Sequence, residues 1–153
     1  VAKWIILKSF KFISLIFLLA NCGFSPIYVK NTNNNFSIEN VIYNGDRELN
    51  NFLKTNLNQY KNEEANKKVS IEAISKYEKI ILTKNTAGKV TNYKLVAKVT
   101  FLIKSTNRKI NITENRIINT MDDKFEEARK ERTIKQNFAS SISNKLASEL
   151  IIN

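Results

Sequence analysis

Few residues of this chain could take part in covalent or metal chemistry. The sequence of 153 residues has no histidine, one cysteine and one methionine. A zinc site needs a set of Cys or His ligands, and a Ser-His or Cys-His nucleophile needs a histidine. A lone cysteine cannot form a disulfide within the chain. We therefore expect no metal and no cofactor.

Paired carboxylates are the remaining catalytic option. Three glutamates lie close together near the start of the last predicted helix, interleaved with basic residues. At helical spacing this pattern is more typical of a solvated helix face with local ion pairs than of an acid-base pair. The glutamates are Glu126, Glu127 and Glu131, and the basic residues are Arg129, Lys130 and Arg132. The sequence therefore predicts a protein that is not an enzyme.

The first 22 residues have the order of a secretory signal. Lys3, Lys8 and Lys11 occur without an acidic residue and precede the apolar run from Phe12 to Ala20. As a helix this run would extend roughly 14 Å, against a hydrocarbon core of about 30 Å. The sequence thus predicts a signal peptide and not a membrane-spanning anchor.

The cysteine directly follows this apolar run. Leu19-Ala20-Asn21-Cys22 resembles a bacterial lipobox, although Asn21 replaces the usual Gly or Ala. A lone cysteine is more often a small buried residue, but this position favours lipidation of Cys22. We expect a lipoprotein signal peptide over 1–21, a lipidated N-terminus and tether over 22–35, and a single domain over 36–153. Gly23 after the cysteine favours export to the outer membrane.

The chain is basic, with a formal net charge of +11. Asn, Lys and Ile are abundant, and their codons are all rich in A and T, so a biased genome would produce this composition without an anionic partner. The lysines are spread along the chain and do not alternate with stacking aromatics as they do in single-strand binders. We expect no nucleic acid partner.

Hydrophobic periodicity predicts the elements of the domain. Residues 36–43 read as a strand, and Asp46 as the N-cap of a helix with apolar positions from Leu49 to Tyr60. Residues 69–82 read as a strand with a bulge between Ala73 and Ile80, because the apolar parity changes there.

The strand over 93–103 is the clearest, with one apolar and one mostly polar face. A turn at Thr106-Asn107 leads to a strand over 109–120. After a capping region at 120–123, a long amphipathic helix follows over 125–151, with Phe125 and Ala128 on its apolar face. The predicted fold is α+β, with two helices packed on one face of a mostly antiparallel four-stranded sheet in the order β-α-β-β-β-α.

Several motifs resemble a known family when they are taken in order. Cys22-Gly23-Phe24-Ser25-Pro26-Ile27-Tyr28 resembles the mature N-terminus of the LptE family of LPS-assembly lipoproteins. Gly45-Asp46-Arg47-Glu48-Leu49, and Gly88 followed by Tyr93-Lys94-Leu95, are similar to later parts of that family. Asn119 and Ala128 are weaker matches.

The resemblance implies an outer-membrane lipoprotein, lipid-anchored on the periplasmic side. It would plug and help assemble the β-barrel LptD, the lipopolysaccharide translocon, and its partners would be LptD, lipopolysaccharide and the membrane. The alternative is another envelope lipoprotein that acts as a scaffold or transporter auxiliary. Lys84, Lys89 and Lys124 are the expected lipopolysaccharide-binding residues, because ammonium groups on mobile segments can bind phosphates. Ordinary surface lysines are the competing interpretation.

Overall fold

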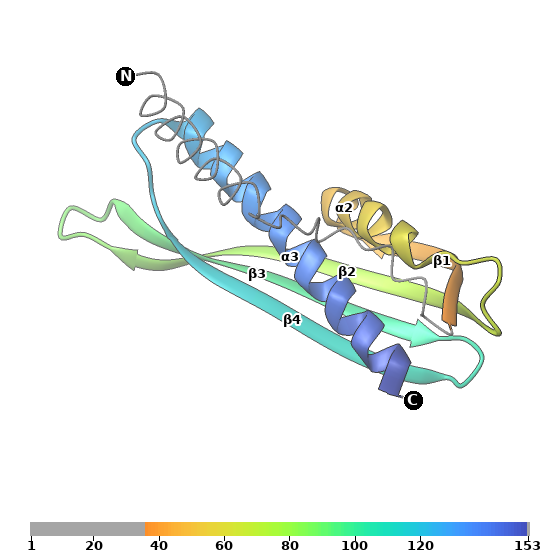
Figure 1. Ribbon diagram of the computed structural model, residues 1–153. Coiled ribbons are helices and arrows are strands. Elements are labelled where there is room, and N and C mark those ends of the chain that lie inside the picture. The colour runs from red at the N-terminus through yellow and green to blue at the C-terminus, as the bar shows by residue number, and fades with distance from the viewer. Residues whose placement is uncertain (1–35, 153) are drawn as a thin grey trace, which may run out of the picture. The chain divides into compact units, whose positions relative to one another are not determined.

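A computed structural model describes residues 36–152 of the chain (Figure 1). Its elements are β1 (Phe36–Gly45), α2 (Arg47–Leu57), the 3-10 turn η1 (Asn58–Tyr60), β2 (Lys67–Lys84), β3 (Val90–Ile103), β4 (Arg108–Asn119) and α3 (Lys124–Ile152). The predicted order β-α-β-β-β-α is therefore confirmed. The predicted signal peptide, Cys22 and the tether lie outside the described residues.

The four strands form one sheet in the order β1-β2-β3-β4. β1 pairs with β2 in parallel, whereas the β2–β3 and β3–β4 pairs are antiparallel. A parallel pair needs a crossover connection, which α2 supplies, and antiparallel neighbours need only a short turn. The sheet is thus mostly antiparallel, as the sequence predicts.

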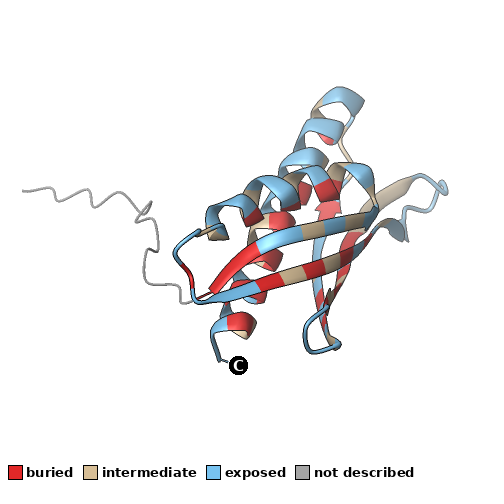
Figure 2. Cartoon of the chain, turned by 90° about the vertical axis from the view of Figure 1, so that its right-hand side faces the viewer, coloured by how far each residue is buried: buried red, intermediate tan, exposed pale blue. Residues whose placement is uncertain are grey.

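Both helices pack on one face of this sheet, and the core lies between the two layers (Figure 2). On β3, alternate residues from Leu95 to Ile103 are at most 5% exposed, which confirms the predicted apolar face. The side chain of Asp46 accepts a hydrogen bond of 2.7 Å from the amide of Leu49 and so begins α2 as predicted. α3 buries an apolar residue at every fourth position, namely Ile134, Phe138, Ile142, Leu146 and Leu150.

The predicted bulge between Ala73 and Ile80 is wrong. The β2–β3 register is unbroken from Ile71 to Ile81, and its first shift falls between Ile81 and Thr83. The apolar parity changes because Ile80 is 45% exposed on the open side of the sheet and does not join the core. The strand itself continues without a break.

The apolar face predicted for the first turns of α3 is also wrong, because Phe125 is 72% exposed and Ala128 is exposed as well. The buried face of the helix, followed back from Ile134, passes through Glu131 and Glu127. Phe125 lies two residues from Glu127, which is roughly 200° around an α-helix. Two carboxylates therefore point toward the sheet here, and the aromatic ring points away.

Candidate functional site

The β2–β3 hairpin projects beyond the helices, and its turn carries two of the three predicted binding residues (Figure 1). The side chain of Asn85 accepts hydrogen bonds from the amides of Ala87 and Lys89, at 3.1 and 2.9 Å. Gly88 completes the turn at φ +78°, a backbone conformation that favours glycine. The amide of Asn85 bonds to the carbonyl of Lys89, so Lys84 and Lys89 flank one tight, exposed turn.

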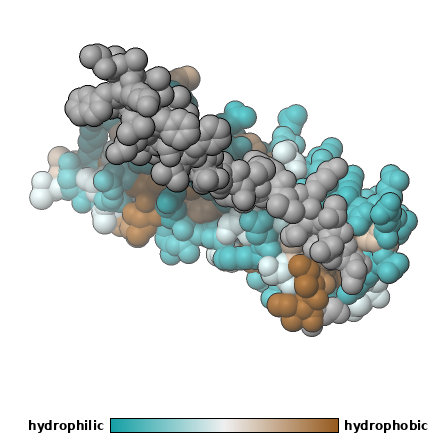
Figure 3. Space-filling view, in the orientation of Figure 1, coloured by the Kyte–Doolittle hydropathy of each residue, from teal (hydrophilic) through white to brown (hydrophobic). Residues whose placement is uncertain are grey.

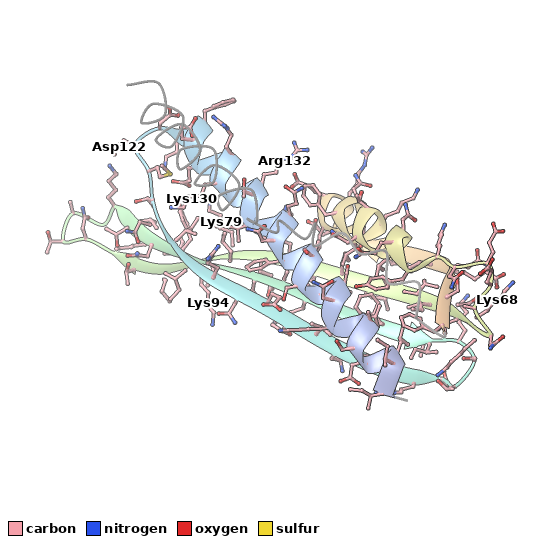
Figure 4. All side chains as sticks on the ribbon, in the orientation of Figure 1. Lys68, Lys79, Lys94, Asp122, Lys130 and Arg132 are labelled. Carbon is pink, nitrogen blue, oxygen red and sulfur yellow. The ribbon has the colours of Figure 1, made fainter. Side chains whose placement is uncertain are left out.

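The loop between β4 and α3 lies beside this hairpin and carries the third residue. The ammonium group of Lys89 is 3.5 Å from the carboxylate of Asp122, and Asp122 precedes Lys124 by two positions (Figure 4). The hydroxyl of Thr120 donates to the carbonyl of Val90 at 3.2 Å, which fixes the loop against β3. The structure thus brings the three lysines to one end of the domain, which we call the basic end.

Lys124 differs from the other two lysines because a buried acid binds it. Its ammonium group lies 3.0 Å from the carboxylate of Glu127, whose side chain is only 6% exposed. The amide of Met121 donates a second hydrogen bond to this carboxylate at 3.0 Å, and Lys79 of β2 donates a third, also at 3.0 Å. Glu127 therefore fixes the start of α3 onto the sheet.

The sequence interpretation of Glu127 as part of a solvated face is wrong. The hydrogen bond from the Met121 amide, followed by the one from Lys124, lowers the pKa of Glu127 from 4.5 to about 2. Lys79 also bonds to Glu131 at 2.8 Å and lies 4.4 Å from the centre of the Tyr93 ring. Desolvation lowers the pKa of Lys79, but the hydrogen bonds to Glu131 and Glu127 outweigh it and the pKa is raised. The lowered pKa keeps Glu127 ionised and the raised pKa keeps Lys79 protonated, so their ion pair persists at neutral pH, which suits a structural role.

Replacing Glu127 with glutamine should lower the free energy of unfolding by about 2–3 kcal/mol. The buried carboxylate would be lost, and with it the charge-assisted hydrogen bonds from Lys79, Lys124 and the Met121 amide. The pKa of Glu127 lies below the unfolded value, so its contribution is complete above pH 4.5 and is lost as the pH falls toward about 2. Urea unfolding at pH 7 and pH 3 measures both effects, and the difference between wild type and variant should shrink at pH 3.

Glu126 supplies the matched control for this change. It forms an exposed pair with Arg129 at 2.8 Å, so Glu126→Gln should cost less than about 0.5 kcal/mol. Equal losses from the two variants would contradict the anchoring role of Glu127.

The open face of the sheet adds a cation that the sequence did not single out as a binding residue. Lys94 of β3 pairs in register with Ile80 on one side and Ile117 on the other, and these isoleucines are 45% and 58% exposed. The three residues in register therefore place the ammonium group of Lys94 between two exposed apolar side chains. Strand alternation alone puts Lys94 on the polar face, but only the register shows which residues flank it.

The basic end combines cations with exposed apolar surface. The apolar residues here are between 45% and 72% exposed; they are Ile80, Ile81, Leu82, Ile117 and Phe125. Figure 3 shows apolar surface next to hydrophilic surface toward this end of the domain. Phosphate groups can pair with the lysines while acyl chains cover the isoleucines. The arrangement is suited to binding an anionic amphiphile.

Among residues 36–152, no cluster of His, Cys, Asp and Glu could hold a metal ion. No helix in that part of the chain has the length and apolar character needed to cross a membrane.

No protein-family model and no curated protein matches the sequence. The fold, however, is similar to that of solved bacterial lipoproteins. The crystal structure of rare lipoprotein B from Shewanella oneidensis has a TM-score of 0.53 and 14% identity, covering 73% of this chain and 93% of that one. The solution structure of an uncharacterized lipoprotein B from Nitrosomonas europaea has a TM-score of 0.54 and 16% identity, covering 77% and 86%. The likeness is one of fold, over nearly the whole length of those proteins.

Proposed function

We propose that this chain is an outer-membrane lipoprotein that plugs and helps assemble the β-barrel lipopolysaccharide translocon. Cys22 would carry the lipid anchor on the periplasmic side of the membrane, and the domain over 36–153 would sit in the barrel LptD. The observation that carries the proposal is a fold similar to that of two solved lipoproteins, in a chain whose only cysteine follows a signal-like segment. The family resemblance of the sequence supports the same assignment.

A large barrel has a polar interior, so a plug needs no lipid-facing surface. Lys94, Lys98 and Thr100 supply polar groups on the open face of the sheet, beside the exposed Ile80 and Ile117. The proposed role also needs a rigid body rather than catalytic groups. The alternative role is a scaffold or transporter auxiliary of another envelope complex, which would share the anchor and differ in its partner.

We further propose that the basic end binds the phosphates of lipopolysaccharide. Replacing Lys84 and Lys89 with glutamate and Lys124 with glutamine should weaken the binding of purified lipopolysaccharide by about tenfold or more, because charge-assisted bonds to phosphate are lost. Lys124 needs the milder change because a glutamate there would face the buried carboxylate of Glu127. The salt dependence of the remaining binding should also become flatter.

The matched control is Lys104→Glu with Lys109→Glu, two exposed lysines at the β3–β4 turn. Both variants should keep the circular dichroism spectrum of the wild type, and only the first should lose affinity. Unchanged lipopolysaccharide binding by the folded triple variant would reject this site and leave the proposals about anchor and barrel intact.

A further inference from the structure

α3 crosses the sheet diagonally. Its N-terminal half is bound to β2, where Lys79 contacts Glu127 and Glu131 at 3.0 and 2.8 Å. Its C-terminal half is bound to β4, where Glu114 contacts Lys145 at 2.6 Å. The helix therefore lies over β4 at one end and moves away from it toward the other (Figure 1).

A groove of about 380 Å³ lies between α3 and the C-terminal half of β4, where the helix moves away from the strand. Its lining residues are Arg116, Ile117, Ile118, Lys130, Thr133, Ile134 and Asn137. Three of them are consecutive on β4, and consecutive strand residues point to opposite faces. The wall on that side is therefore the edge of the strand, including its backbone.

β4 is the last strand of the sheet, so its outer edge has no strand partner among the described residues. Its pairing with β3 is unbroken over the whole strand, from Asn119 to Arg108. The opposite edge, β1, has a register shift between Ile38 and Asn40. Regular open edges accept an additional extended strand, whereas bulges discourage it. Of the two edges, β4 is the one suited to strand addition.

The charged side chains at the edge of β4 indicate which kind of additional strand could bind there. Arg116 and Lys130 line the groove, and no acidic residue is among its lining residues. Neither cation forms an ion pair within the part of the chain that the structure describes, and Figure 4 shows where Lys130 lies on α3. Arg116 lies on the helix side of β4, the side of buried Ile112 and Ile118, whereas Ile117 is 58% exposed on the open side. An added strand would need acidic side chains on the helix side and apolar side chains on the open side. An anionic lipid would match the two cations but would leave the backbone edge unpaired.

We propose that the β4 edge docks an extended, acidic segment of a partner protein, which adds to the sheet beside β4. Its carboxylates pair with Arg116 and Lys130, and its alternate apolar side chains contact Ile117. Backbone hydrogen bonds supply affinity, and the two cations supply specificity. The inference stands on the edge and the groove alone, and it does not depend on the proposed function.

The test uses the full chain and a synthetic peptide in which glutamate and valine alternate. The peptide has about ten residues, which is within the usual range of strand lengths. The peptide should protect alternate amides of β4 from hydrogen exchange, and a peptide alternating lysine and valine should not bind. The double variant Arg116→Glu, Lys130→Glu should lose at least about tenfold in affinity for the acidic peptide and should now bind the basic one.

The control is Lys54→Glu with Lys61→Glu, which makes the same charge change in the groove beside β1. This variant should bind the acidic peptide as wild type does. Any of four results would overturn the proposal: protection at β1 instead of β4, retained binding by the Arg116 and Lys130 variant, self-association of the chain through β4, or β4 protection by anionic phospholipid vesicles but not by the peptide.

Discussion

Replacing Gly45 with alanine should lower the free energy of unfolding of the domain by more than about 4 kcal/mol, or prevent it from folding. Gly45 ends β1 at φ +101°, and a Cβ atom added there would lie 1.8 Å from the backbone carbonyl oxygen of Ser75 on β2. That oxygen also accepts the amide of Asp46 at 3.2 Å, so it cannot move without breaking the junction between β1 and α2. The new methyl group would therefore separate the two parallel strands. Urea unfolding of the purified variant measures the loss.

Gly88 provides the control for backbone conformation. It has φ +78°, but an added Cβ would meet nothing within 4 Å. Gly88→Ala should therefore lower the free energy of unfolding by only about 1–2 kcal/mol, the energy that alanine needs to adopt the left-handed conformation. Similar losses from both variants would show that the contact with Ser75 does not limit the substitution.

Replacing Cys22 with serine should abolish lipid attachment completely. Serine lacks the thiol on which we propose the lipid is carried, and the sequence has no second cysteine to replace it. The variant should accumulate as an unprocessed precursor without lipid label, and it should leave the detergent phase because each buried CH₂ group of an acyl chain contributes about 0.8 kcal/mol. Metabolic labelling with palmitate and detergent partitioning measure both effects.

Asn21→Ala is the companion variant, since it restores the small residue usual before a lipidated cysteine. It should keep the label and be processed at least as fast as the wild type. Normal processing and membrane partitioning of the Cys22→Ser chain would contradict the lipoprotein proposal.

Local signals predicted the elements well because their causes are local. The alternation from Tyr93 to Ile103 reflects a strand with one buried face, and the carboxylate of Asp46 caps the first turn of α2 regardless of the rest of the fold. The fourfold spacing from Ile134 to Leu150 likewise marks the buried face of α3. These features need no knowledge of which segments meet in space.

The errors occur where distant segments decide the outcome. Glu127 looks solvated on its helix, but it is buried because Lys79 of β2 meets it. Ile80 looks like a core residue, but the register places it on the open face beside Lys94. Periodicity also cannot reveal the groove at Arg116 and Lys130, since that groove exists only because α3 crosses the sheet diagonally. For Lys84, Lys89 and Lys124, the sequence identified the segments, and the fold brings these to one end.

We propose that the chain works inside a large outer-membrane β-barrel. Affinity purification of the full-length, lipidated protein from detergent-solubilised outer membranes tests this most directly, with the Cys22→Ser chain as the matched control. We expect the lipidated protein to recover one very large β-barrel in fixed stoichiometry, and the serine variant to recover much less. Recovery of an ABC-transporter component instead, or of no barrel at all, would contradict the proposal.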